Sequence, residues 1–353
     1  MPDNFNLFST GVMTKAVELM PRTYTFLSDT FAKEGEVYED DNVMYDYRRG
    51  TETGLAPFVV PGTGGVAVNR DPFEMRRIAF TTLAPEIPLT LADVSTRQFG
   101  ETVMGGKTPE QRQKQVLARD LTKLRGMNQN SRNWLIREVM LKGKMEIRRY
   151  TKNGREKEPS MVADFGFQNI YVPATAWNQP GAKINYDMEK AFDIVYDGLG
   201  DVDIMVMGAG VFEAMSENSD YLKKLDMDHV YMGEIATKYA GQGVRYRGSN
   251  SDGVKMVSYS GHFVNFDRRV EYYIPEGYIL MGSSSNKPLT IHHGPINDFV
   301  GQDETAKIKT YIKKEVAFRK GGASTESITT RLVSSPTVVP DNIGAWCLMK
   351  VLG

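Results

Sequence analysis

Residues 108–143 carry the sequence TPEQRQKQVLARDLTKLRGMNQNSRNWLIREVMLKG, which is the strongest structural signal in the chain. Thr108 and Pro109 are favoured residues at the start of a helix, and Gly143 is a favoured residue just past its end. Between them, apolar side chains recur at helical spacing: Leu117, Leu121, Leu124, Leu135 and Val139. The pattern predicts one helix over 109–141, about 50 Å long at 1.5 Å per residue. Such a length is typical of a scaffold against which other segments pack, and we call this element the spine helix.

The segment before the spine helix predicts a short helix and a long hairpin. Residues 11–20 have a helical apolar face that ends before Pro21. Residues 43–47 and 78–83 are strand-like runs, and the stretch 54–65 between them is rich in Gly and Pro. A two-stranded hairpin cannot bury both of its faces alone. We therefore expect this hairpin to lie on another surface.

The rest of the chain predicts mixed helices and strands. Strand patterns occur at 145–149, 161–167, 202–207, 253–259, 270–274 and 278–281, and helix patterns at 186–200 and 211–216. In the tail, one face of a strand would carry Ile308, Ile312, Val316 and Phe318. A last strand would begin at Trp346.

Composition disfavours several classes of protein. The chain has 353 residues, 41% of them hydrophobic, and its 43 Lys and Arg against 44 Asp and Glu give a net charge of −1. A strongly basic protein that wraps nucleic acid is disfavoured, because phosphate binding needs an excess of positive charge. Cys347 is the single cysteine, so neither an intrachain disulfide nor a CxxC metal site can form. We expect no membrane span and no secretory leader, because the sequence has no long apolar stretch.

No motif predicts a catalytic site, a metal site or a cofactor. The Gly208–Glu213 turn joins a strand to a helix across glycines, as a dinucleotide-binding loop does, but Glu213 stands where a small residue is needed and would repel a pyrophosphate. We interpret the turn as a strand–helix corner. His292 and His293 would point to opposite faces of a strand and could not share a metal ion. Cys347 lies in an apolar strand, where a thiolate is disfavoured.

Charge is segregated along the chain although the total is nearly neutral. Residues 34–54 hold seven acids against two arginines, a net of −5, and residues 109–158 hold 14 Lys and Arg against six acids, a net of +8. This pattern suits pairing between neighbouring subunits, although both segments could instead face water. The candidate intersubunit contacts are Glu39, Asp40, Asp41, Arg48, Arg49, Phe58, Arg119, Arg125, Arg132 and Arg137.

The order of these parts resembles the major capsid proteins of tailed bacteriophages, which have the Hong Kong 97-type fold. The closer resemblance is to the lambda-type capsid protein E family, and it rests on VRYRG at 244–248, KMVSYSGHFV at 255–264 and IPEGYILMG at 274–282. The resemblance implies an α+β capsid fold with five parts: an N-terminal arm (1–33), an extended β-hairpin loop with its base (34–106), a peripheral domain with the spine helix (107–172), an axial domain (173–303) and return strands of the peripheral domain (304–353).

The resemblance also implies a function without catalysis. The chain would assemble into hexamers and pentamers of an icosahedral phage head that encloses double-stranded DNA, contacted non-specifically. Its partners would be further copies of itself, a portal protein, a separate scaffolding protein and, optionally, a decoration or cementing protein. The scaffold is expected in trans because only about 33 residues precede the extended loop. Assembly would take place in the host cytoplasm, and the product would be the capsid of the virion.

Two alternatives stay open at this point. One is a cellular, encapsulin-like compartment shell of the same fold, and the less favoured one is a nucleotide-binding enzyme built on the Gly208–Glu213 turn.

Some relatives join an extended-loop lysine covalently to a neighbouring subunit. No lysine lies between Lys33 and Lys107, so that cross-link is not expected here.

Overall fold

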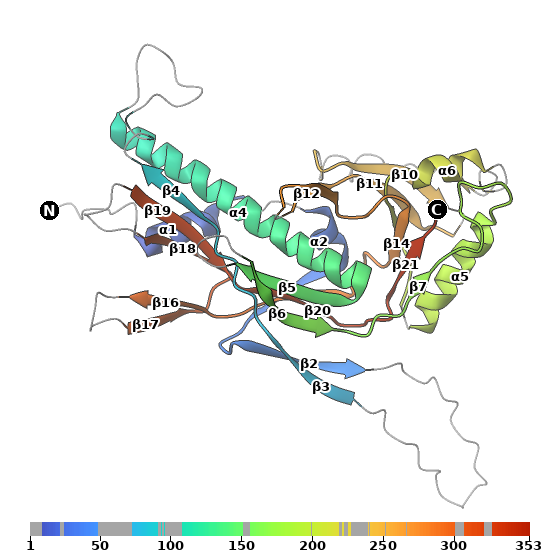
Figure 1. The fold of residues 1–353 in the computed structure, drawn as a ribbon, viewed down its shortest axis with the longest axis horizontal. Coiled ribbons are helices and arrows are strands. Elements are labelled where there is room, and N and C mark those ends of the chain that lie inside the picture. Colours follow the sequence, from blue (N-terminus) through green and yellow to red (C-terminus); the bar gives the residue numbers. More distant parts are fainter. Residues whose placement is uncertain are drawn as a thin grey trace, which may run out of the picture.

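The computed structural model describes residues 9–21, 25–48, 73–90, 93, 95, 108–150, 156–198, 200–218, 221, 225–226, 239, 241–250, 252–265, 267–300, 307–320 and 327–353. Its elements form an elongated body, and a long helix runs diagonally from one end into the middle of it (Figure 1). Within the described residues, no helix is long and apolar enough to cross a membrane.

The long helix is α4 (Pro109–Lys142), which confirms the predicted spine helix. Its start is fixed by a reciprocal pair of hydrogen bonds, in which the Gln111 backbone N–H donates to the Thr108 hydroxyl and the Thr108 N–H donates to the Gln111 side chain. Its end is fixed by Gly143, which has a left-handed φ of 62°. A Cβ at Gly143 would lie 2.1 Å from Cβ of Phe167, so only glycine fits.

The amino-terminal half of α4 packs on a small sheet. The sheet has the strand order β18 (Glu315–Lys320), β19 (Ser327–Ser334), β4 (Glu86–Thr90), and α1 (Thr10–Leu19) lies against β18. The core between these elements consists of buried apolar side chains: Met13, Val17, Leu89, Val116, Leu117, Leu121, Leu124, Ala317 and Leu332. The leucines that define the helical pattern in this half of the spine therefore face the sheet.

A seven-stranded sheet forms the other end of the body. Its strand order is β7 (Ile170–Tyr171), β21 (Trp346–Lys350), β14 (Tyr278–Gly282), β8 (Ile204–Met207), β11 (Lys255–Tyr259), β10 (Val244–Asn250) and β9 (Leu225–Asp226). Alternate residues face two different layers, because successive side chains of a strand point to opposite faces. Met205, Ile279 and Cys347 share a core with α5 (Ile184–Asp197) and α6 (Val211–Glu217). Val206, Leu280 and Trp346 share the core of the carboxyl-terminal half of α4.

The two ends are joined by a third sheet. In it β15 (Leu289–His293) pairs in parallel with β1 (Ala32–Val37) and antiparallel with β20 (Pro336–Pro340). The short helix α2 (Phe26–Phe31) leads into β1 and packs on α4. Phe31, Leu289 and Val338 belong to the same buried cluster as the carboxyl-terminal half of α4. The spine helix thus touches both ends of the subunit.

The described part of the chain also contains four two-stranded hairpins. They are β2 (Asn42–Arg48) with β3 (Phe73–Ala79), β5 (Lys144–Tyr150) with β6 (Glu156–Asp164), β12 (His262–Val264) with β13 (Val270–Tyr272), and β16 (Ile296–Val300) with β17 (Lys307–Tyr311).

The first of these hairpins confirms the base of the predicted long hairpin. Val43 and Ile78 are opposite one another in register and buried, whereas Met44 on the other face is 53% exposed. The ribbon therefore lies on the body by one face, as expected. The second strand begins earlier than predicted and ends at Ala79. The predicted tip at 54–65 lies outside the described residues.

The prediction of one continuous tail strand over 308–319 is wrong, because this range contains two strands. Ile308 lies in β17 and is 67% exposed, whereas Val316 and Phe318 lie in β18 and are buried. The two strands are separated by a bend at Lys313 and Lys314. Lys314 lies on the face assigned to Ile312 and Val316, so the three successive charged residues 313–315 interrupt the alternation and mark the bend.

Candidate assembly surface

The acidic candidates lie together in one exposed turn. Glu39, Asp40 and Asp41 connect β1 to β2, and all three are exposed. The Asp41 carbonyl accepts a 3.1 Å hydrogen bond from the Phe80 N–H, which fixes the turn to the base of the hairpin. No ion pair reaches these three carboxylates from the parts of the chain that the structure describes. They form a negatively charged projection, which we call the acidic turn.

Three of the four candidate arginines of the spine helix are engaged inside the subunit. Arg125 places Nε 3.5 Å from Glu315 and donates from Nη1 to the carbonyls of Met20 and Pro21 at 3.1 and 3.3 Å. Arg137 donates to the Tyr273 carbonyl at 3.2 Å. Its guanidinium also lies 3.7 Å from Glu271 and 5.5 Å from the centre of the Phe263 ring.

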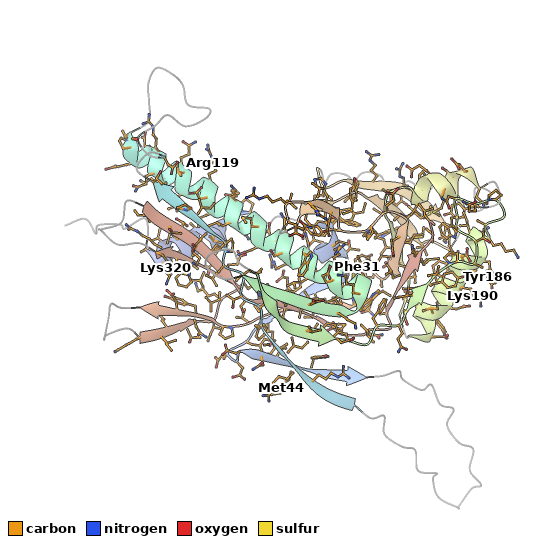
Figure 2. The ribbon with its side chains drawn as sticks, viewed as in Figure 1. Phe31, Met44, Arg119, Tyr186, Lys190 and Lys320 are labelled. Atoms are coloured by element: carbon orange, nitrogen blue, oxygen red, sulfur yellow. The ribbon has the colours of Figure 1, made fainter. Side chains whose placement is uncertain are left out.

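Arg132 pairs with Glu34 at 3.4 Å, so Arg119 is the most accessible of the four. Arg119 points away from the body on the outer side of α4, next to Asp120 (Figure 2). Arg48 ends β2 opposite Phe73, while Arg49 and Phe58 lie outside the described residues. A contact between the acidic turn and these arginines stays a prediction, and the internal pairs leave Arg119 as its best spine-helix partner.

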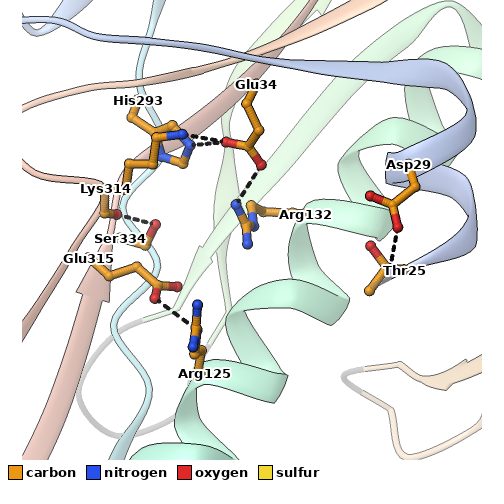
Figure 3. Close-up of polar contacts among 9 residues, drawn as sticks. All are labelled: Thr25, Asp29, Glu34, Arg125, Arg132, His293, Lys314, Glu315 and Ser334. Atoms are coloured by element: carbon orange, nitrogen blue, oxygen red, sulfur yellow. Dashed lines mark hydrogen bonds and ion pairs between the residues drawn. The ribbon is translucent and has the colours of Figure 1, made fainter. Parts of the chain in front are cut away.

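A polar junction that the sequence did not reveal surrounds Glu34 (Figure 3). Glu34 Oε1 is 3.4 Å from Arg132 Nη1 of α4, and Oε2 is 2.8 Å from Lys314 Nζ and 3.5 Å from His293 Nε2 of β15. We call Glu34, Arg132, His293 and Lys314 the Glu34 junction. Burial opposes the charge of Glu34, but the neighbouring His293, Lys314 and Arg132 hold its pKa well below its usual range. One carboxylate thus ties β1 to the spine helix, to β15 and to the start of β18.

A cleft of about 540 Å³ opens beside the Glu34 junction, between α1, α2, α4 and the residues before β18. Opposite charges pair along its wall, as Lys313 Nζ and Glu18 Oε1 do at 2.8 Å. Glu315 lies deeper, and burial raises its pKa although Arg132 and Arg125 are close. The cleft therefore has the character of an internally paired polar seam.

The remaining candidate motifs are accounted for by packing. Gly208 allows the Pro275 carbonyl to approach, since a Cβ there would lie against that oxygen, and Gly210 begins α6 with a left-handed φ of 80°. The strand–helix corner predicted for this turn is confirmed. Burial raises the pKa of the Cys347 thiol to about 12. Within the described residues, no group of three or more His, Cys, Asp or Glu side chains could hold a metal ion.

Together, the arm helix, the hairpin on the body, the spine helix and the seven-stranded sheet define the Hong Kong 97-type capsid fold. Residues 9–351 match the phage major capsid protein E family, so the chain belongs to that family and is a shell protein of a phage head.

Solved structures share this fold at low sequence identity. The crystal structure of a protein assigned as the capsid protein of a prophage in E. coli CFT073 has a TM-score of 0.69 at 14% identity, over 97% of this chain and 98% of that chain. A phage-related protein from Bordetella bronchiseptica RB50 has a TM-score of 0.52 at 10% identity, over 96% of each chain. None of the curated proteins matches the chain significantly in sequence. The family match favours the phage head over the encapsulin-like alternative.

Proposed function

We propose that this shell protein forms hexamers and pentamers that tile an icosahedral head around double-stranded DNA. The observation that carries the proposal is the family match over residues 9–351. The surface of the subunit supports it, because the β2–β3 ribbon extends from the body and exposes Met44 on its outer face (Figure 2). Exposed ribbons of this kind gain stability when a neighbouring subunit covers them.

The proposed division of the subunit has five parts along the chain, and one buried cluster joins the spine helix to the seven-stranded sheet. The N-terminal arm is 1–33, the extended loop is 34–106, the peripheral domain is 107–172 and the axial domain is 173–303. The return segment 304–353 contributes β18, β19 and β20 to the peripheral side. Its last strand, β21, departs from that division, because it pairs with β14 and buries Cys347 and Met349 in the core of the seven-stranded sheet.

The proposed partners follow from a structural rather than catalytic role. They are further copies of the chain, a scaffolding protein supplied in trans, a portal protein, optionally a decoration protein, and DNA held without sequence specificity. The near-zero net charge is compatible with a shell that is filled after assembly, because such a shell does not need a strongly basic surface to recruit DNA.

The size of the purified protein in solution tests this proposal. A shell subunit should sediment as very large particles, or as mixed large assemblies when the scaffolding protein is missing. A uniform small oligomer at every protein concentration, with or without co-expressed head proteins, would contradict the proposal. It would favour the alternative of a nucleotide-binding enzyme built on the Gly208–Glu213 turn.

A further inference from the structure

The β12–β13 ribbon exposes two valines and an aromatic side chain on the face that points away from its own subunit. Strand register places His262 opposite Tyr272 and Val264 opposite Val270. These four side chains share the outward face, where Val264 is 64%, Val270 63% and Tyr272 45% exposed. The inward face pairs Phe263 with Glu271. We call the outward set the ribbon face.

The inward face packs on the spine helix. Phe263 is buried in the cluster that holds the carboxyl-terminal half of α4, and Arg137 of α4 lies 3.7 Å from Glu271 and 5.5 Å from the centre of the Phe263 ring. Because successive side chains of a strand point to opposite faces, Val264 and Val270 lie on the other side of the ribbon and take no part in that core. Scattered exposed hydrophobic residues are ordinary, but contiguous ones in register on one face mark an interaction surface.

Charge next to the ribbon face indicates what covers it. The turn between the strands carries the exposed residues Asp267, Arg268 and Arg269, a net charge of +1, and neither arginine has an ion pair with any part of the chain that the structure describes. The acidic turn has the complementary layout, with Asp40 and Asp41 close in sequence to the exposed Met44. The exposed Arg77 stands opposite Met44 across the β2–β3 ribbon, so the three carboxylates of the acidic turn leave that surface with a net negative charge. Each surface thus combines exposed apolar side chains with charge, and the net charges of the two are opposite.

The two surfaces lie on opposite sides of the molecule. In the view of Figure 1, β12 is at the upper edge, β2 is at the lower edge, and α4 with the hairpin β5–β6 runs between them. They cannot meet within one subunit, but a second copy placed head to tail brings them together. Head-to-tail contacts are the kind that close subunits into a ring.

We propose that the ribbon face and Arg268–Arg269 of one subunit receive the acidic turn and Met44 of the next subunit in the ring. The inference rests on the proposed function, because it concerns how subunits of the shell contact one another. It identifies the partner surface as a second copy of this chain, and it replaces the internally engaged arginines Arg125, Arg132 and Arg137 as the positive side of the contact.

Site-directed cross-linking tests the contact directly. Cys347 is the single cysteine and is fully buried, so introduced cysteines react against a clean background. Particles assembled from a mixture of Met44→Cys and Val264→Cys subunits and treated with a short bismaleimide should give a covalent dimer. Particles of either variant alone should give none, because the contact joins two different surfaces. Val172→Cys is the matched control, since Val172 is a valine with 61% exposure at the far edge of the seven-stranded sheet.

The outcomes separate this inference from the proposed function. If the unmodified chain forms no large particles, the proposed function fails. If particles form but the Met44→Cys and Val264→Cys mixture gives no more dimer than the Val172→Cys control mixture, the inference is overturned and the ribbon face has another occupant or none.

Charge exchange provides a second readout. Reversing Arg268 and Arg269 to Glu should lower the yield of particles roughly tenfold, because like charges then face each other across the contact. Adding Asp40→Arg and Asp41→Arg to the same chain should restore the yield. Circular dichroism of the variants should match the unmodified subunit, and the exposed Arg245→Glu variant serves as the control. If the variant with all four charge changes folds but its particle yield stays low, the inference is also overturned.

Discussion

Replacing Glu34 by Gln should loosen the attachment of β1 to the rest of the subunit. The variant keeps the shape of the side chain but removes the charge that faces Arg132, Lys314 and His293. Lys314 is about half exposed and contributes little, whereas Arg132 has only 17% of its side chain exposed and contributes more. About one-third of the Glu34 side chain is exposed, and water weakens its ion pairs. We therefore expect a smaller loss than for a fully buried charged hydrogen bond. We expect the free energy of unfolding to fall by about 1–2 kcal/mol at neutral pH.

The pH dependence of this loss is a sharper test than its size. The pKa of Glu34 is lower in the folded subunit than its ordinary value of 4.5, so its ionised form stabilises the fold above about pH 4.5. That contribution is lost as the pH falls below this value, because the unfolded chain then takes up the proton first. The difference in urea-unfolding free energy between the unmodified chain and the Glu34→Gln variant should therefore shrink between about pH 5 and about pH 3.

Glu36→Gln is the matched control for this measurement, because Glu36 is an exposed residue of the same strand. Its effect should stay within about 0.5 kcal/mol. Equal stability of the Glu34→Gln variant and the unmodified chain at pH 7, or a difference that does not change with pH, would refute the role of the Glu34 junction.

Three further predictions concern backbone, thiol and covalent chemistry. Gly143→Ala should destabilise the subunit by about 2–4 kcal/mol, seen as a lower thermal midpoint, because the position needs a left-handed φ and a Cβ would meet Phe167. Gly126→Ala in the same helix, where the added Cβ meets open space, should instead be neutral or slightly stabilising. Cys347 should not react with a thiol reagent at pH 8 until denaturant is added; rapid labelling of the native protein would contradict its burial and raised pKa. Particles boiled in detergent should run as single chains near 39.6 kDa, and a ladder of covalent oligomers would show that another lysine supplies the cross-link.

The elements that could be predicted from the sequence are those whose signals are local. The spine helix carries its own periodicity and both of its caps, so its prediction over 109–141 differs from α4 by one residue. Within the strand predicted at 202–207, residues 204–207 are all apolar because both faces of β8 are covered, one by α5 and α6 and the other by α4. Such patterns depend on burial alone and do not require knowledge of the partner.

The interactions that could not be predicted join residues far apart in the chain. Glu34 meets Arg132 across 98 positions and Lys314 across 280, and no spacing rule links them. A glycine inside a strand can mark the close approach of another segment, and Gly35 in β1 is an example. A Cβ at this position would lie 2.6 Å from His292 Nδ1. The positive charge of the spine segment is evident in the sequence, but the sequence does not show that Arg125, Arg132 and Arg137 have partners within their own subunit.

Cryo-electron microscopy of particles assembled from the purified chain can show whether the subunit builds a phage-head shell. We expect closed or curved shells in which the repeating density fits this subunit, arranged in rings of six and five with the spine helix and the seven-stranded sheet recognisable in every copy. A preparation that contains only a small, discrete oligomer, even when head-assembly partners are co-expressed, would contradict this expectation.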